Sequence, residues 1–456
     1  MWNQNTFRWR LCYANETQLF SRVPLGSLLA ASLFLVSGCG DDTTEQIVPN
    51  GEMETQNESE NLSCDVNEFV VGNSCMQCPD GQWNLAGDDP SGEDTFCSSS
   101  IVCSTLSPGD TFADSELNEY LVVENGNGPN GIRNIDVLGE IINGNIRVCT
   151  SHVTDMESLF FDESTFNEDI GDWDVGNVTN MASMFNGANV FDQDIGDWDV
   201  SNVTNMVSMF RLTQSFNQDI GDWDVNNTTV MGAMFSNALA FNQDIGDWDV
   251  SNVTNMASMF NSADVFDQDI GGWDVSNVTV MEGMFSDALM FNQEIGDWDV
   301  SNLENMMNMF RNASEFNQDI SQWDVSNVTN MNALFQSADN FNGNIGNWDV
   351  GNVTTMNFLF FNTETFNQDI GNWNVENVRS MRQMFNDAQE FNQDIGAWDV
   401  SQVDNMNNMF DGAMAFTQDL STWLVPLISS TPQNFFLGSG NEGVISKEPQ
   451  WGASSL

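Results

Sequence analysis

Residues 241–263 read FNQDIGDWDVSNVTNMASMFNSA, and variants of this stretch recur along most of the chain. Phenylalanine keeps a 25-residue interval in two columns, which run from 166 to 416 and from 160 to 410. Tryptophan keeps the same interval without insertion or deletion at Trp173, Trp198, Trp223, Trp248, Trp273, Trp298, Trp323, Trp348, Trp373, Trp398 and Trp423. A fixed period of about 20–29 residues is typical of a solenoid, in which stacked coils bury their apolar sides against one another.

The pattern inside one repeat predicts a strand followed by a short helix. Trp248 and Val250 are two residues apart and share one face of an extended segment, while Asp247 and Asp249 share the other face. The apolar residues between 253 and 260 then recur three or four apart, which is helical spacing. We therefore expect an α/β fold, a solenoid of stacked coils that each contain one strand and one helical turn, over residues 166–424.

The unit W-D-V-S-N-V-T-x-M-x-x-M-F resembles the 25-residue repeat of the BspA-type leucine-rich-repeat surface proteins, over 275 of the 456 residues. This resemblance implies a leucine-rich-repeat-like solenoid at the cell surface, with roles such as adhesion or binding of host or matrix molecules, and it implies no reaction. One departure concerns the asparagine of the leucine-rich-repeat ladder. Its place is taken by Val253, and the asparagine stands one residue earlier at Asn252, so the turn there is expected to differ.

The amino end is expected to be an export signal, residues 1–38. An apolar run at 25–37 follows Arg8, Arg10 and Arg22, and it is too short for a permanent membrane span. It ends in LVSGC, which resembles a bacterial lipobox and implies a lipid on Cys39. The alternative is an ordinary secretory signal whose cysteine enters a disulfide. The lipid predicts a bacterial cell-envelope lipoprotein held in the bilayer through Cys39, at the outer membrane or cell surface.

Residues 39–63 are acidic and polar, so they are expected to form a disordered, lipidated tether. Residues 64–145 are expected to hold a small disulfide-rich module, which looks distantly similar to the Cys-rich repeats of growth-factor receptors. Once Cys12 is removed with the signal and Cys39 carries lipid, six cysteines remain to form disulfides: Cys64, Cys75, Cys78, Cys97, Cys103 and Cys149. Of the 15 pairings we favour 64 with 75, 78 with 97, and 103 with 149, while a zinc or redox role for the CxxC at 75–78 is the alternative.

Both ends of the repeats are expected to be capped, by residues 146–165 and by residues 425–456. The only histidine, His152, falls in the first cap, where a structural role is expected rather than catalysis. The recurring Asn-Val-Thr is expected to be a turn with side chains bonded to the backbone, although it fits a glycosylation sequon. The tryptophan column is expected in the core rather than as a sugar-stacking stripe, because it shares its parity with the valines.

The chain carries 67 acidic against 10 basic residues, a net charge of −57, which excludes a nucleic-acid binder held by a basic patch. Neighbouring carboxylates in a parallel stack would lie about 4.8 Å apart and repel by about 1 kcal/mol in bulk water. The candidate binding face consists of Asp172, Asp174, Asp197, Asp199, Asp222, Asp224, Asp247, Asp249, Asp297 and Asp299. The same face with Asp169, Asp194, Asp219 and Asp244 is a weak Ca²⁺ candidate. The alternative is a solvated acidic surface.

The composition and the uniformity of the repeats indicate which classes of function to expect. We expect no enzyme, because one histidine and one lysine, Lys447, leave little for acid/base chemistry and because uniform repeats offer no distinctive site. We expect a surface protein that binds a polymeric or multivalent extracellular protein or glycan. The alternatives are a structural surface coat and, further behind, a polysaccharide-active enzyme using stacked carboxylates.

Overall fold

Residues 60–456 form one unit, and the computed structural model describes residues 68–71, 74–77, 100–113 and 118–453 of it. The predicted signal, the tether, the lipid on Cys39 and the pairings of Cys64, Cys75, Cys78 and Cys97 lie outside what the structure describes. In the described part of the chain no helix has both the length and the apolar character needed to cross a membrane.

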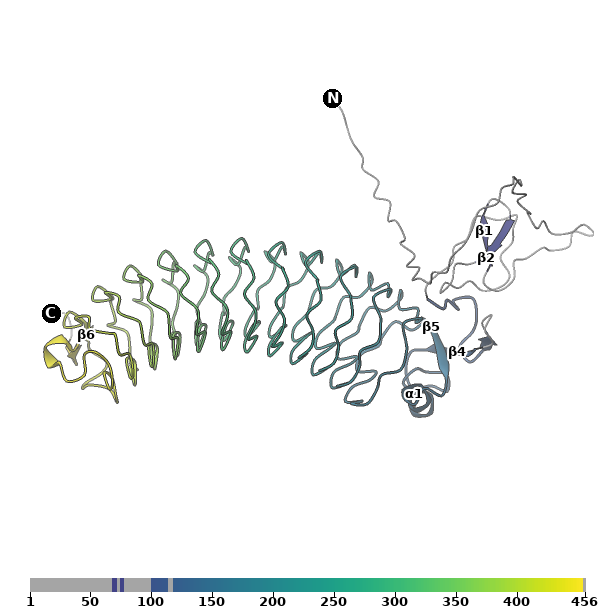
Figure 1. Cartoon of the computed structure of the whole chain (residues 1–456), viewed down its shortest axis with the longest axis horizontal. Coiled ribbons are helices and arrows are strands. Elements are labelled where there is room, and N and C mark those ends of the chain that lie inside the picture. The colour runs from purple at the N-terminus through teal and green to yellow at the C-terminus, as the bar shows by residue number, and fades with distance from the viewer. Residues whose placement is uncertain (1–67, 72–73, 78–99, 114–117, 454–456) are drawn as a thin grey trace, which may run out of the picture. The chain divides into compact units, whose positions relative to one another are not determined.

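Conventional secondary structure is found ahead of the repeats. Strands β1 (Glu68–Val71) and β2 (Ser74–Gln77) pair antiparallel. Strands β3 (Thr111–Ala113), β4 (Glu119–Glu124) and β5 (Arg147–His152) form a sheet in the order β3–β4–β5, in which β4 and β5 run parallel. Helix α1 (Ile135–Ile142) precedes β5 (Figure 1). Strands β4 and β5 and helix α1 close the first coil, because Val123, Ile132, Ile141 and Val148 belong to the same buried core as the repeats.

The disulfide predicted between Cys103 and Cys149 is present, with 6.3 Å between the two Cα atoms. Both cysteines are fully buried and pack with Ile101, Tyr120 and Val122 in a second, smaller core. The Nε2 atom of His152 lies 2.8 Å from the carbonyl oxygen of Leu106, so this histidine joins the first cap to the segment that precedes it. Its expected structural role agrees with this contact.

The repeats stack in sequence order, so that residues 25 apart lie side by side (Figure 1). Parallel bridges join Asn180 to Asn205, Asn205 to Val230 and Val230 to Asn255, and the series continues to Asn405 with one break between Val280 and Asn305. Tryptophan lies in the core as expected, since no repeat tryptophan is more than 4% exposed. The tandem-repeat fold that the 25-residue period predicts is therefore what the structure contains.

The expected strand and helix of each coil are not formed. Between residues 153 and 423, all of which are described, the chain contains turns, extended segments and isolated bridges, but no named helix or strand. In the turn ladder, defined as residues 254–262 and their equivalents, N–H groups alternate between two acceptors. Those of residues 256, 258, 260 and 262 donate to the next coil over 2.8–2.9 Å, whereas those of residues 259, 261 and 263 donate to the carbonyl three residues back.

This alternation explains why a helix-like apolar pattern does not make a helix. Ser258 and Ser262 both have φ of 55°, which turns their N–H groups toward the neighbouring coil and interrupts α-helical bonding. Consecutive turns place apolar side chains three or four residues apart much as a helix does. Met256, Met259 and Phe260 are accordingly buried, while each backbone N–H still finds an acceptor.

The last coil is covered by the carboxyl-terminal segment. Strand β6 (Leu424–Val425) pairs in parallel with β7 (Gln450–Trp451), and a 3₁₀ helix, η1 (Ile445–Lys447), lies between them in sequence. The Phe435 ring lies edge-on to that of Phe410 in the last full repeat, with centroids 5.4 Å apart, and edge-on to Trp451, with centroids 5.0 Å apart.

Candidate functional site

The acidic columns lie on the tryptophan edge, defined as residues 244–252 and their equivalents, and most of their side chains are exposed. Two of the three columns have a structural role in the first four coils of the candidate face, and one of them has it in the coil that contains Asp297. A carboxylate oxygen of Asp244 accepts the N–H of Gly246 at 3.1 Å, and one of Asp249 accepts the N–H of Ser251 at 3.1 Å. The same bond is made by Asp169, Asp194, Asp219, Asp174, Asp199, Asp224 and Asp299. Each of these aspartates therefore fixes a tight turn.

Hydrogen bonds lower the pKa of several of these carboxylates. The side-chain hydroxyl and then the backbone N–H of Ser251 hold the pKa of Asp249 below its usual value. Ser276 and Ser326 act in the same way on Asp274 and Asp324. Because bonding to the charged form favours ionisation, these turns are most stable when the aspartates are charged.

The tryptophan edge is wider than the strand spacing expected from the sequence. Centroids of Trp223 and Trp248 are 6.5 Å apart, whereas those of Phe235 and Phe260 are 5.7 Å apart. Along this edge, which is described throughout, no backbone hydrogen bond joins one repeat coil to the next. Within the described residues no group of three or more His, Cys, Asp or Glu side chains is arranged to hold a metal ion.

Side chains bridge the coils along this wider edge. Each tryptophan from Trp198 to Trp423 donates its indole N–H to the carbonyl oxygen of the isoleucine 28 residues earlier, at 3.0–3.2 Å. Asn252 donates its amide N–H to the Asn226 carbonyl oxygen at 2.8 Å, and eight equivalent asparagines do the same. Asn252, which stands one place earlier than the asparagine of a leucine-rich repeat, therefore still connects neighbouring coils. The Asn-Val-Thr segment forms a turn whose asparagine side chain bonds the backbone, as expected.

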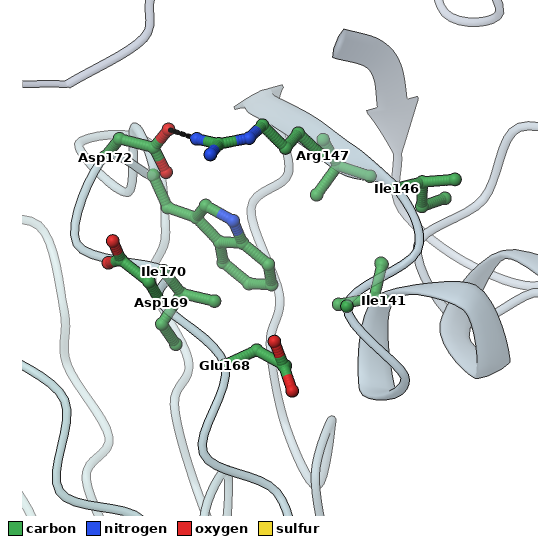
Figure 2. A pocket seen from close by; sticks show the side chains of 10 residues that line it. Ile141, Ile146, Arg147, Glu168, Asp169, Ile170 and Asp172 are labelled. Atoms are coloured by element: carbon green, nitrogen blue, oxygen red, sulfur yellow. Dashed lines mark ion pairs between the residues drawn. The ribbon is translucent and has the colours of Figure 1, made fainter. Parts of the chain in front are cut away.

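The middle acidic column behaves unevenly. Asp197, Asp222, Asp247 and Asp297 are exposed, whereas Asp172 is half-buried where the first coil meets the cap. It accepts a hydrogen bond from the Tyr120 hydroxyl at 2.9 Å and lies 3.9 Å from the Arg147 guanidinium (Figure 2). Burial raises the pKa of Asp172 despite both contacts. The adjoining cavity has a volume of about 120 Å³, well below the roughly 300–1,000 Å³ of ligand pockets. The contacts of Asp172 with Tyr120 and Arg147 join the cap to the repeats.

One shallow groove interrupts the acidic face at Gly272, where a Cβ atom would meet nothing within 4 Å. It has a volume of about 810 Å³ and is lined by polar groups, including Asp269, Glu294, Asp297 and Asp319. Its lining is suited to hydroxyl or cationic groups, but its carboxylates form no metal cluster. Of the sequence-predicted site residues, the groove contains only Asp297.

A second distinctive place lies on the turn ladder and was not among the predicted site residues. Phe358 and Phe361 are half-buried on the solvent side of one coil, with ring centroids 5.9 Å apart. The guanidinium carbon of Arg382, in the next coil, lies 5.0 Å from the centre of the Phe358 ring. The sequence contained a pattern that could have identified this place, because residue 358 is aromatic whereas the equivalent residue in other coils is small or polar.

These observations define a tandem-repeat protein whose surface is built from recurring side-chain columns. Residues 140–247, 234–348 and 329–441 match the family described as "Mycoplasma protein of unknown function, DUF285", and the chain belongs to that family. No curated protein matches the chain, and no solved structure matches it either.

Proposed function

We propose that this chain is a leucine-rich-repeat-like solenoid of the bacterial cell surface, anchored through a lipid on Cys39, that binds a polymeric or multivalent extracellular partner and catalyses no reaction. The observation that carries the proposal is the turn ladder. Most of its backbone N–H groups, with exceptions that include Gly232, Met281 and Glu282, are bonded within the coil or to a neighbouring coil, so it offers its partner side chains rather than a free strand edge.

The repetition of the coils supports an extended partner. Equivalent positions recur once in every coil. From Phe210 to Phe360, the ring centroids of neighbouring phenylalanines in the column that contains Phe235 are 5.7–5.9 Å apart. A ligand with repeating units can occupy several such positions at once, and the linked contacts raise its overall affinity. Few titratable groups other than carboxylates lie on these faces, which favours recognition over catalysis.

The test uses the full chain, made with its own leader and purified from membranes in detergent. It is passed over immobilised neutral and acidic polysaccharides and extracellular-matrix proteins, with and without Ca²⁺ or a chelator. We expect saturable binding to one class of partner that survives chelation. Ordered self-assembly without saturable binding would instead support the surface coat, and depolymerisation of a bound polysaccharide would support the enzyme.

The anchor has its own test. Cys39→Ser removes the sulfur that would carry the lipid, so the variant is expected to leave the membrane fraction while keeping the binding of the native chain. A Cys39→Ser protein that stays in the membrane fraction would contradict the anchor.

A further inference from the structure

The coil that contains Phe358 departs from all other coils on the turn ladder. Phe358 has φ of 58°, a left-handed conformation that bulky residues rarely adopt. At the same place the other coils carry Ser158, Ser183, Ser208, Ala233, Ser258, Gly283, Asn308, Ala333, Gln383 and Asn408. An aromatic side chain held in a strained conformation, where small polar residues suffice elsewhere, points to a role other than stability.

Aromatic and cationic groups meet at this place. Phe361 lies edge-on to Phe358, and Arg382 stacks over the Phe358 ring from the next coil. Arg379, three residues earlier than Arg382, is exposed as well. Within the described residues neither arginine forms an ion pair, although the chain has 67 acidic residues. Two guanidinium groups therefore stay available for an anion outside the chain.

The surrounding side chains are amides and hydroxyls. Thr355 donates to the Asn332 amide oxygen at 2.7 Å, and Ser380 donates to the Asn357 amide oxygen at 2.6 Å. The Asn357 amide N–H in turn donates to the Thr355 hydroxyl at 2.9 Å. Earlier coils have Val207, Gly232 and Ala257 in the column that contains Asn332, Asn357, Arg382 and Asn407. This part of the ladder is thus richer in hydrogen-bonding groups than the earlier coils.

We propose that Phe358, Phe361 and Arg382 form a saccharide site for a sugar unit that carries a carboxylate, as in a uronic-acid polysaccharide. This inference deepens the proposed function and rests on it. The apolar face of a pyranose ring packs on the phenylalanine rings, and a guanidinium fork pairs with the carboxylate through two parallel hydrogen bonds. The neighbouring amides bond the sugar hydroxyls.

An acidic peptide fits the same surface less well. Most of the ladder N–H and carbonyl groups are used between and within coils, so a peptide backbone finds no edge to pair with. The net charge of −57 opposes the approach of any polyanion, but at physiological ionic strength this repulsion is screened beyond about 8 Å. Contact therefore depends on Arg382 at the site.

The experiment measures binding of the full chain to polygalacturonate. Dextran is the probe that has sugar units but no charge, and poly-glutamate is the probe that has carboxylates but no sugar. Phe358→Ser installs the residue found at Ser258, and Arg382→Asn installs the residue found at Asn357 and Asn407. The matched control, Arg211→Ser, removes an arginine from a different coil and installs the residue found at Ser236. Thermal unfolding of every variant is recorded beside binding.

We expect the wild type to bind polygalacturonate in preference to both other probes. Phe358→Ser and Arg382→Asn are expected to weaken this binding by at least about tenfold, with a melting temperature unchanged or, for Phe358→Ser, higher, and Arg211→Ser to bind like wild type. Unweakened binding by both site variants would overturn the site. Equal binding of poly-glutamate, or saturable binding of a matrix protein alone, would overturn the assignment of a saccharide as the ligand, while the proposed function would still stand. The proposed function itself fails if no partner binds or if a bound polysaccharide is depolymerised.

Discussion

The two edges of each coil are joined in different ways. Along the turn ladder, N–H groups of one coil meet carbonyl oxygens of the next, as Ser258 does with Glu282 at 2.9 Å. Along the tryptophan edge, the indole of Trp298 and the amide of Asn252 make the connection. The aromatic columns differ as well, with ring centroids about 5.7 Å apart near the ladder and 6.5 Å apart in the tryptophan column. No backbone hydrogen bond joins the repeat coils along the tryptophan edge, all of which the structure describes, so the recurring Trp and Asn side chains supply hydrogen bonds between coils there.

The largest effect is expected from removing a bridge that is also core. Trp298→Ala deletes a side chain that is 3% exposed, packs over Trp273 and bonds the Ile270 carbonyl oxygen. We expect a loss of about 3–5 kcal/mol in the free energy of unfolding. Since each coil contacts only its neighbours, denaturant unfolding followed by fluorescence should lose its single transition. Trp298→Phe, which keeps a ring but not the indole N–H, should lose less, and an unchanged transition in Trp298→Ala would contradict the inward tryptophan.

A proline tests the opposite edge. Ser258→Pro removes the N–H that bonds Glu282 and cannot adopt the φ of 55° found at this position, so we expect a loss of about 3 kcal/mol or more. The matched change is Ser258→Gly, because Gly283 holds the equivalent place in the next coil with φ of 63°. It should leave the melting temperature within a few degrees of wild type. Equal losses from proline and glycine would contradict the backbone ladder.

Much of the core could be predicted from the sequence alone. A 25-residue period without gaps requires equivalent residues to stack, and the two-residue spacing of Trp248 and Val250 places both side chains inward, as they are. The disulfide between Cys103 and Cys149 was also predictable as a link between the cysteine-containing region and the first coil.

The helix was mispredicted because apolar spacing alone does not distinguish a helix from consecutive turns. A second pattern carried the missing information. The place equivalent to Ser262 has positive φ, and in most coils its occupant is one that tolerates this conformation: Asp162, Gly187, Asn237, Asp287, Asn312, Asn362, Asp387 and Gly412. A run of Asn, Asp and Gly at one column is unfavourable inside a helix and indicates a turn.

The acidic columns were correctly placed outside the core, but their role needed backbone geometry. An aspartate followed two residues later by glycine or serine, as at Asp244 and Gly246, is a readable turn pattern. Read in that way, two of the columns are turn residues, and whether they also bind a partner stays a prediction. The Phe358 cluster depends on contacts between neighbouring coils, and only the structure brings Arg382 over its ring.

A smaller effect is expected from a bridge that is not core. Asn252→Ala removes the bond to the Asn226 carbonyl oxygen and little apolar surface, so we expect a loss of about 1 kcal/mol in the free energy of unfolding. Asn252→Asp keeps the size but cannot donate, and it should lose at least as much. Chemical denaturation of the two variants measures this, and a neutral Asn252→Asp would show that the ladder asparagine contributes nothing through its N–H.

The smallest effects concern single carboxylates, and their signs should be opposite at two places. Burial, and then the Asp287 carboxylate, raise the pKa of Asp264, so its ionised form is destabilising in the folded chain. Asp264→Asn should therefore stabilise the protein at pH 7 by less than about 1 kcal/mol. This advantage should vanish as pH falls through the raised folded pKa to below about 4, where the aspartate is protonated in both states.

At Asp249 the hydrogen bonds from Ser251 lower the pKa, so the ionised form is stabilising above the unfolded pKa of about 3.9. Asp249→Ala should then destabilise the protein slightly at pH 7, and the deficit should shrink as pH falls through the lowered folded pKa. Melting temperatures of both variants and wild type from pH 7 to pH 3 measure the two differences. Because Asp249 fixes a turn while Asp264 faces another carboxylate, a shared sign at pH 7 would mean that repulsion, rather than the turns, governs the acidic side chains of this chain.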